Sequence, residues 1–243
     1  MQYWGLTDPG CVRTQNQDAY QIVQLDRSTV LAVLCDGMGG AKSGNIASAL
    51  AIDVFVQELR RVHKAGMSVE AVEQMLISAT KLANFTVYDQ AKQFEEFDGM
   101  GTTLVAAYVS GKKVTVVNVG DSRCYRVNRE GIEQVTRDHS LVELMVERGE
   151  LTPEQARTYP GKNYITRAIG TETLVECDLF HLKLERGDAL LLCSDGLSNI
   201  VDEQEMLFEV VHGVNKEYCC QRLLDIAKMR GAPDNVTSVL VLA

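Results

Sequence analysis

A short apolar run that ends at one carboxylate and several glycines constrains the fold of this chain more than any other feature. Residues 31–40 read LAVLCDGMGG. The run is too short to cross a membrane and turn-forming residues follow it at once, which predicts a buried strand. Gly37 and the glycines after it permit a sharp turn and the close approach of a ligand. Asp-Gly is also an ordinary hairpin signal, so this stretch alone leaves Asp36 either a turn former or a functional acid.

The length and the hydrophobic content allow one substantial core. The chain has 243 residues, of which 46% are hydrophobic, and we expect residues 1–243 to form a single domain. No apolar run approaches the roughly 18 residues of a membrane helix, and the start of the chain lacks a basic segment followed by a hydrophobic one. The sequence therefore predicts a soluble, cytoplasmic protein without a membrane partner, and we expect a monomer.

The charge and the cysteines argue against several classes of partner and site. The formal net charge is −9, which argues against nucleic acid as a partner because its phosphates are bound by Lys and Arg. An anionic substrate would need positive charge from another source, and bound divalent cations can supply it. The seven cysteines include no C-x-x-C pair, so neither a disulfide framework nor a zinc cluster is expected.

Hydrophobic periodicity predicts both strands and helices. Helical spacing of apolar residues predicts one helix after Ser43 and a second helix from Ser68 toward Phe94. The Val- and Thr-rich segment from Gly101 to Asp121 predicts a hairpin with its turn at 110–112. Further strands are expected at 3–8, 19–25, 178–184, 189–193 and after Asp234, and further helices from Asp202 and over 215–230.

Two capping patterns lie between the strand-rich segments. Ser140 is followed three residues later by Glu143, and Thr152 precedes a proline and, three residues on, Gln155. Both patterns are typical of helix starts. Residues 141–165 are therefore predicted to form a small helical insertion over one edge of the sheet.

Aspartates border several of the predicted strands. Asp36, Asp121, Asp195 and Asp234 each lie at a strand end, and Asp18 begins another strand. A single aspartate in such a place usually forms a turn. Clustered together without histidine or cysteine, these side chains would suit Mg²⁺ or Mn²⁺, which prefer oxygen ligands. Two such ions about 3.5–4 Å apart would hold an activated water for attack on phosphorus, but the sequence does not show whether the strand ends converge.

A series of motifs occurs in an order that is typical of one enzyme family. The motifs are Asp8-x-Gly10-x-x-Arg13-x-x-Asn16-x-Asp18, Asp36-Gly-Met-Gly-Gly40, Gly101-Thr-Thr103, Val119-Gly-Asp-Ser-Arg123, Asp138-His-Ser140, Thr166-Arg-Ala-Ile-Gly170, Ser194-Asp-Gly196 and Asp234-Asn235. In this order they resemble the metal-dependent protein phosphatases of type 2C, in the minimal bacterial form without a regulatory domain. The resemblance extends from near residue 3 to the C-terminus.

The resemblance implies an α+β fold, a four-layer α-β-β-α sandwich in which helix pairs flank two antiparallel sheets. The helices after Ser43 and Ser68 would cover one sheet, and the two C-terminal helices would cover the other. Residues 141–165 would form a mobile flap beside a metal cleft at one end of the sandwich.

The resemblance also implies a metal site built from oxygen ligands. Two Mg²⁺ or Mn²⁺ ions would be tightly bound and bridged by Asp36, with the carbonyl of Gly37 as a further ligand. Asp121 would hold a weaker third ion. The full set of expected metal ligands is Asp18, Asp36, Gly37, Asp121, Asp195 and Asp234.

Two further positions bear on the expected chemistry. Arg13 would bind the substrate phosphate with its forked donors, although an isolated arginine more often forms a surface salt bridge. Many bacterial members carry a histidine directly after Asp-Gly-Met-Gly-Gly, viewed as the proton donor to the leaving group, whereas this chain has Ala41. The loss of a general acid costs about 10²–10⁴-fold if nothing replaces it. A water on the third ion at Asp121 could replace it.

The function that the resemblance implies is hydrolysis of phosphoserine and phosphothreonine in proteins, by attack of a metal-bridging water, as part of bacterial signalling. Its partners would be phosphorylated proteins made by a Ser/Thr protein kinase. Ala41 motivates an alternative, a catalytically weak or silent module that binds phosphoproteins. A third hypothesis keeps the chemistry but restricts the substrate to one small regulatory protein.

Overall fold

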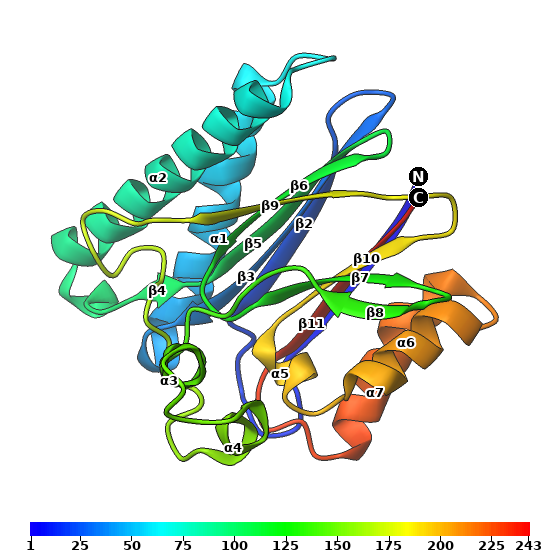
Figure 1. Ribbon diagram of the computed structural model, residues 1–243. Coiled ribbons are helices and arrows are strands. Elements are labelled where there is room, and N and C mark those ends of the chain that lie inside the picture. Colours follow the sequence, from blue (N-terminus) through cyan, green and yellow to red (C-terminus); the bar gives the residue numbers. More distant parts are fainter.

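Two antiparallel β-sheets lie face to face at the centre of the computed structural model, which describes residues 1–39, 43–156 and 158–243 (Figure 1). The strands are β1 (Gln2–Asp8), β2 (Asp18–Gln24), β3 (Thr29–Met38), β4 (Gly101–Thr102), β5 (Leu104–Ser110), β6 (Lys113–Val119), β7 (Arg123–Asn128), β8 (Gly131–Gln134), β9 (Asp178–Lys183), β10 (Ala189–Cys193) and β11 (Val236–Leu242). One sheet has the order β1-β11-β10-β7-β8. The other has the order β2-β3-β5-β6-β9, with β4 paired to β3.

Helices cover the outer face of each sheet (Figure 1). The long helices α1 (Gly40–Val62) and α2 (Val69–Gln93) pack on the sheet that contains β3, and α6 (Glu203–His212) and α7 (Cys219–Met229) pack on the other. The predicted α-β-β-α sandwich is therefore confirmed. The remaining helices are α3 (Leu141–Glu147), α4 (Pro153–Thr158), α5 (Asp195–Ser198) and the 3₁₀ turns η1 (Glu95–Phe97) and η2 (Lys216–Tyr218). No helix in the described ranges is long and apolar enough to cross a membrane.

The apolar run in β3 is continuous because both faces of this strand are buried. Leu31, Val33 and Cys35 belong to the core beneath α1 and α2, whereas Ala32 and Leu34 belong to the core between the two sheets. Successive side chains of a strand point to opposite faces. A strand between a helical layer and a second sheet therefore needs an apolar residue at every position.

The ends of two strands differ from the prediction. β3 continues through Asp36 to Met38, because β4 pairs with its last two residues, so the interpretation of Asp36 as part of a hairpin turn is wrong. The strand expected to end at Asp121 stops at Val119. The chain then crosses from one sheet to the other, because the next strand, β7, pairs with β10. Asp121 lies in this crossing.

The last helix starts later than predicted. A helix was expected over 215–230, but α7 begins at Cys219 after the 3₁₀ turn η2. The ammonium group of Lys216 donates hydrogen bonds to the carbonyl oxygens of Val210, Val211 and Gly213, at the end of α6. This turn therefore closes the end of α6 and delays the start of α7. The short strand β8 was also missed by the sequence analysis.

The segment 141–165 forms a helical excursion that is closed at its base. Ser140 accepts a hydrogen bond from the N–H of Glu143 at the start of α3, and Thr152 and Gln155 form a complete capping box at the start of α4. A β-bridge joins Ser140 to Ile165, so the two ends of the excursion meet. This arrangement agrees with the helical insertion that the sequence predicts.

Candidate metal centre

Asp18 and Asp36 lie opposite each other on neighbouring strands. They are partners in the register of β2 and β3, and burial together with the charges of Asp18 and Asp195 raises the pKa of Asp36. Thr103 fixes the backbone of Asp36 from the other side. Its N–H donates to the Asp36 carbonyl oxygen over 2.9 Å, and its Oγ1 accepts from the Asp36 N–H over 2.9 Å.

Asp18 is held by hydroxyl groups through only one of its two carboxylate oxygens. Ser194 Oγ and Thr237 Oγ1 donate to Asp18 Oδ2 over 2.7 and 2.6 Å. Asp18 Oδ1 is buried, and no donor among the described residues reaches it. Because an unpartnered buried carboxylate oxygen is costly, this oxygen is a ready ligand for a cation.

The strand ends converge on one cleft of about 570 Å³. Asp36 lines it from β3, Asp121 from the crossing between the sheets, Asp195 from the first residue of α5, and Asp234 from the loop before β11. Asp18 lies buried behind this lining. The structure therefore brings together all five aspartates that the sequence analysis singled out, together with Gly37.

The carboxylates raise one another's pKa values. Burial is the largest cause for each group, and the charges of neighbouring aspartates add to it. The pKa of Asp18 rises to about 6 and the pKa of Asp121 to about 7. The pKa values of Asp36 and Asp195 also lie above the ordinary value of an aspartate. A set of buried acids that repel one another is a setting in which a cation stabilises the charged forms.

Arg13 lies at the edge of the same cleft and pairs with Asp234. Its guanidinium donates to Asp234 Oδ2 over 2.9 Å, and the two side chains are 55% and 40% exposed. An ion pair this exposed is weak. The structure thus shows Arg13 in a salt bridge, the alternative named for an isolated arginine, and places that salt bridge at the cleft that the acids line.

The donor chemistry of the cleft fits a hard divalent cation, although the ligands are not drawn together around one point. The carboxylates and the Gly37 carbonyl offer only oxygen, and one buried oxygen has no donor. Across residues 1–39, 43–156 and 158–243, no three His, Cys, Asp or Glu side chains are arranged to coordinate an ion. Asp234 is engaged by Arg13, and Asp195 accepts from Asn199 Nδ2 over 3.1 Å, so these two acids must turn to complete a coordination shell.

Thr237, which supports Asp18, was missed by the sequence analysis, and Asn235 was named there only as part of a motif, without a role of its own. Thr237 is the second residue of the largely apolar strand β11, and a hydroxyl in that strand is the one signal that could have identified it. Asn235 holds the loop that carries Arg13: its side chain accepts from Gln17 N–H and donates to the carbonyl oxygens of Pro9 and Gln15. Ala41, the position of the expected histidine, lies outside the described residues.

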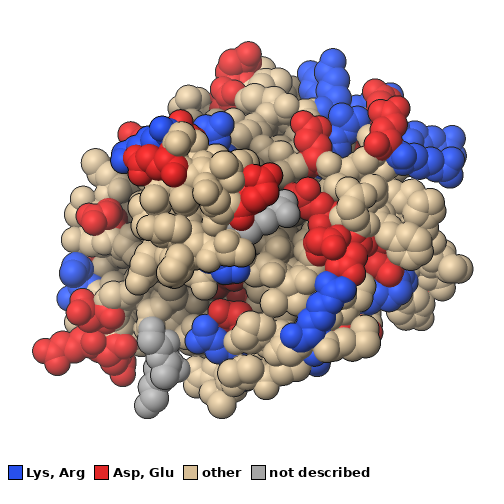
Figure 2. All heavy atoms as spheres, turned by 60° about the horizontal axis from the view of Figure 1, so that its bottom comes forward, with Lys and Arg blue, Asp and Glu red and all other residues tan. Residues whose placement is uncertain are grey.

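A second hollow of about 740 Å³ adjoins the cleft between the helical excursion and α5 and α6. Asp121 and Asp195 line both hollows. The acids Asp138, Glu143, Asp202 and Glu203 add to the second hollow. Figure 2 shows the end of the molecule that carries α3, α4 and α5, and acidic side chains are prominent beside the middle of this face. The cleft therefore adjoins a second hollow that is rich in acidic side chains, called the acidic groove from here on.

Known proteins resemble this chain over nearly its whole length. The family "Protein phosphatase 2C" matches residues 12–225. The serine/threonine phosphatase stp of Listeria monocytogenes is 34% identical over 97% of this chain and 93% of its own length. The protein phosphatase PhpP of Streptococcus pneumoniae is 35% identical over 97% of this chain and 95% of its own length.

Solved structures of other proteins share the fold over nearly the whole chain. The serine/threonine phosphatase Stp1 from Staphylococcus aureus has a TM-score of 0.93 and 38% identity, and the match covers 99% of this chain and 94% of that chain. The serine/threonine phosphatase of S. agalactiae has a TM-score of 0.93 and 32% identity, and the match covers 100% and 99%. The chain therefore belongs to the protein phosphatase 2C family of serine/threonine phosphatases.

Proposed function

We propose that this chain hydrolyses phosphoserine and phosphothreonine in proteins with the help of Mg²⁺ or Mn²⁺. Two tightly bound ions would be held by Asp18, Asp36, the Gly37 carbonyl, Asp195 and Asp234, and Asp121 would hold a weaker third ion. The observation that carries the proposal is the buried, unpartnered Asp18 Oδ1 beside acids whose pKa values are raised by burial and by one another. When bound, such ions neutralise phosphate charge and lower the pKa of water, so that hydroxide is available near neutral pH.

The protein's own groups position the substrate and the acids. Arg13 offers two parallel N–H donors to a phosphate, a geometry that lysine cannot reproduce. To do so it leaves Asp234, which is inexpensive because the pair is exposed, and the same movement frees Asp234 as a ligand. Thr103 holds the backbone of Asp36, and Ser194 and Thr237 hold Asp18, so these two acids stay fixed while Arg13 moves.

No histidine is positioned to protonate the leaving group. None of the chain's four histidines lines the cleft as the structure describes it. His63 contacts Asp26 and Tyr108, and His181 contacts Glu73. The proposal therefore assigns the proton to a water in the cleft beside Asp121, where the weaker third ion would be held.

The substrates are proposed to be proteins phosphorylated by a Ser/Thr kinase, and the enzyme is proposed to act as a monomeric, single-domain signalling protein of the bacterial cytoplasm. The acidic groove beside the cleft supports a protein substrate, because it offers room for residues that flank the phosphorylated side chain. The alternative of a silent binding module gains no support, since four of the acids line the cleft and Asp18 lies buried behind them.

The test is phosphate release from an aryl phosphate and from phosphoserine peptides, with Mn²⁺ or Mg²⁺ and with excess chelator. We expect activity only with metal, and a loss of at least about 100-fold in Asp36→Asn, because a carboxylate that would hold the ions is removed. Asp53→Asn, on the exposed face of α1, is the matched control and should retain full activity. Equal activity in chelator would contradict the proposal.

A further inference from the structure

Arg13 lies at the exposed tip of a loop whose base is closed by one buried side chain. The loop spans residues 9–17 between β1 and β2, and its residues 11–15 are all exposed. Asn235 directly precedes β11 near the other end of the chain and is 4% exposed. Its amide group reaches the loop both before and after Arg13 in the sequence.

The Asn235 side chain uses both of its N–H groups and its oxygen in this contact. Its Nδ2 donates to the carbonyl oxygen of Pro9 over 3.0 Å and to that of Gln15 over 2.9 Å. Its Oδ1 accepts from the Gln17 N–H over 2.8 Å. Because a side-chain amide offers two N–H donors and one oxygen acceptor, these three bonds join the first and the last part of the loop at one point.

The backbone that carries this amide is closely packed on two sides. A Cβ added to Gly10 would lie 2.1 Å from the carbonyl oxygen of Asp234, and a Cβ added to Gly196 would lie 1.9 Å from the carbonyl oxygen of Asn235. The segment before β11 is therefore held between the base of the loop and the start of α5. Asn235 is thus a fixed support for the loop.

The same part of the loop is bonded to the backbone beside the acids. The Gln17 carbonyl oxygen accepts from the Gly37 N–H over 3.1 Å and from Ser48 Oγ over 2.6 Å. Gly37 follows Asp36, and Ser48 lies on α1. Asn235 and Gln17 therefore set the base of the loop relative to the acids of the cleft.

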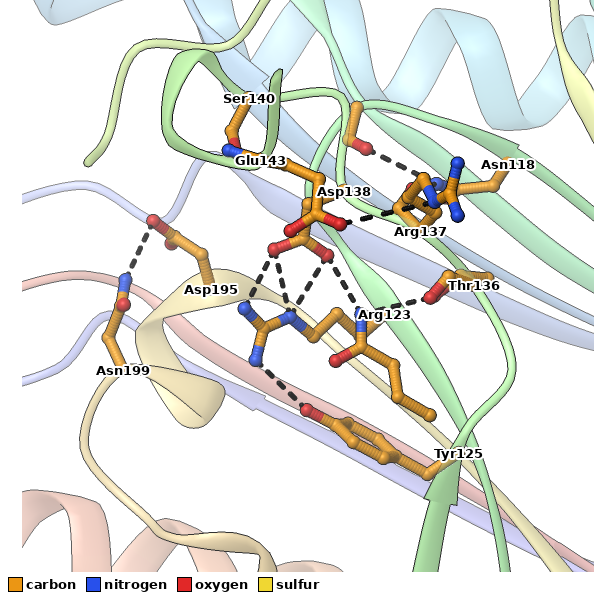
Figure 3. A network of polar contacts seen from close by, with 12 residues as sticks. Asn118, Arg123, Tyr125, Thr136, Arg137, Asp138, Ser140, Glu143, Asp195 and Asn199 are labelled. Carbon is orange, nitrogen blue, oxygen red and sulfur yellow. Dashed lines mark hydrogen bonds and ion pairs between the residues drawn. The ribbon is translucent and has the colours of Figure 1, made fainter. Parts of the chain in front are cut away.

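The bond of the Arg13 side chain is too weak to place the loop by itself. Arg13 contacts Asp234, but the two side chains are 55% and 40% exposed, and ion pairs this exposed contribute little. Asp195, by comparison, is bonded to Asn199 only four residues later in the chain (Figure 3). The position of Arg13 at the cleft depends instead on the base of its loop, where Asn235 supplies three hydrogen bonds.

We propose that Asn235 is a positioning residue that holds Arg13 at the cleft for binding the phosphate group of the substrate. With the base of the loop closed, only the Arg13 side chain has to turn from Asp234 to the phosphate. Without the Asn235 amide the loop is freer to move, so substrate binding has to order it and becomes weaker. The inference rests on the proposed role of Arg13 as a phosphate ligand.

Asn84 provides a matched case of a buried asparagine that supports a loop away from the cleft. It is 1% exposed, its Nδ2 lies 3.0 and 3.4 Å from the carbonyl oxygens of Glu172 and Thr173, and its Oδ1 accepts from the Gly170 N–H over 2.8 Å. None of these residues lines the cleft as the structure describes it. Loss of either asparagine amide should lower the free energy of unfolding, but only loss of Asn235 should weaken phosphate binding.

A double-mutant cycle between Asn235 and Arg13 tests the inference. Hydrolysis of p-nitrophenyl phosphate at saturating Mn²⁺ gives KM and kcat for the wild type, Asn235→Ala, Arg13→Ala, the double variant and Asn84→Ala. Inhibition by inorganic phosphate gives Ki for the same proteins. Neither KM nor Ki depends on the concentration of folded enzyme, so a partly unfolded variant does not distort them.

We expect Arg13→Ala to raise KM and Ki by about 10- to 100-fold, because hydrogen bonds to a charged group are lost. Asn235→Ala should raise both by about 3- to 10-fold, since the Cys11 N–H still ties the loop to the carbonyl oxygen of Ala232. In the double variant, Asn235→Ala should add nothing to the effect of Arg13→Ala, because its effect acts through the arginine. Asn84→Ala should keep the KM and Ki of the wild type.

The outcomes separate this inference from the proposed function. A wild type without metal-dependent hydrolysis overturns both. An active wild type whose KM and Ki are unchanged by Asn235→Ala overturns only the positioning role. Effects of Asn235→Ala and Arg13→Ala that multiply in the double variant also overturn it, because Asn235 would then act on another part of the site.

Two further results decide the remaining cases. Unchanged KM and Ki in Arg13→Ala would overturn the phosphate role of Arg13 and the inference together, while metal-dependent hydrolysis would stand. If Asn235→Ala does not fold, Asn235→Ser takes its place in the cycle. Its hydroxyl can replace at most part of the amide's bonds, so it should raise KM and Ki in the same way.

Discussion

At the scale of single residues, the main feature of the site is that its buried acids lack a full set of hydrogen-bond donors or positively charged partners among the described residues. Asp18 has hydroxyl donors on one oxygen and no donor on the other. Asp36 is surrounded by the charges of Asp18, Asp195 and Asp121. Evolution of the sequence toward stability alone would not retain such a cluster, because buried unpaired carboxylates are destabilising.

This cluster predicts an inverted dependence of stability on pH for the metal-free protein. The pKa values of Asp18 and Asp121 rise to about 6 and about 7 on folding, so the folded state binds more protons than the unfolded state between about pH 4 and pH 7. Stability from these groups is therefore greatest at low pH and falls as pH rises through that range. Bound Mn²⁺ competes with the protons, so its stabilising effect grows with pH.

Thermal unfolding at pH 5.5 and pH 7.5, with Mn²⁺ and with chelator, checks this prediction. The rise in Tm caused by Mn²⁺ should be larger at pH 7.5, and the difference between the two pH values should shrink in Asp36→Asn. Other titrating groups change Tm equally with Mn²⁺ and with chelator at a given pH. Their effect therefore cancels in the rise in Tm that Mn²⁺ causes. A rise in Tm that is the same at both pH values would contradict the account.

At the scale of elements, the sequence predicted those features that depend on residues close together in the chain. Ser68 caps α2 and Asp202 caps α6 as expected, because a cap depends on residues three positions apart. The extension of β3 to Met38 could not be predicted, since it depends on pairing with β4 about 60 residues later in the chain. The crossing that carries Asp121 depends in the same way on the distant partner of β7.

The turn before Asp121 offers a test of this long-range dependence. Gly120 has φ of 105°, and a Cβ there would lie 2.6 Å from Thr103 Cγ2. Gly111, in the turn between β5 and β6, has φ of 58° and nothing within 4 Å of a Cβ. Gly111→Ala should cost only the left-handed strain of about 1–2 kcal/mol, whereas Gly120→Ala should cost about 1–3 kcal/mol more from overpacking.

Urea unfolding of the two variants measures this difference directly. Both glycines have positive φ, although Gly120 at 105° lies further from the left-handed helical region than Gly111 at 58°, and only Gly120 has another loop close to the position of a Cβ. Equal losses of unfolding free energy in Gly111→Ala and Gly120→Ala would show that Thr103 does not constrain the turn.

At the scale of the whole molecule, the sequence patterns predicted individual strands and helices, whereas the four-layer architecture was implied by the resemblance to a family. Continuous apolar strands and two pairs of amphipathic helices agree with two sheets buried on both faces. That Asp18, Asp36, Asp121, Asp195 and Asp234 meet at one end of the sandwich is a property of topology, and only the resemblance to a family indicated it in advance. Nothing local in the sequence distinguishes these aspartates from ordinary turn formers.

The salt bridge of Arg13 is another contact that local sequence patterns could not predict. Its forked donors indicated a phosphate ligand, and its position at the cleft agrees with that, but its bond to Asp234 depends on a residue 221 positions away. The structure therefore adds a contact that the sequence could not indicate: under the proposed function, Arg13 would have to leave Asp234 when it binds phosphate.

Under the proposed function these acids would bind two ions tightly, and Asp36 would contribute to both sites. The number of Mn²⁺ ions bound per chain, from titration calorimetry or anomalous scattering, is measured in the wild type, Asp36→Asn and Asp53→Asn. We expect two tight ions in the wild type and in Asp53→Asn, and loss of both in Asp36→Asn. A wild type that binds no ion tightly, or an Asp36→Asn variant that keeps both, would contradict this expectation.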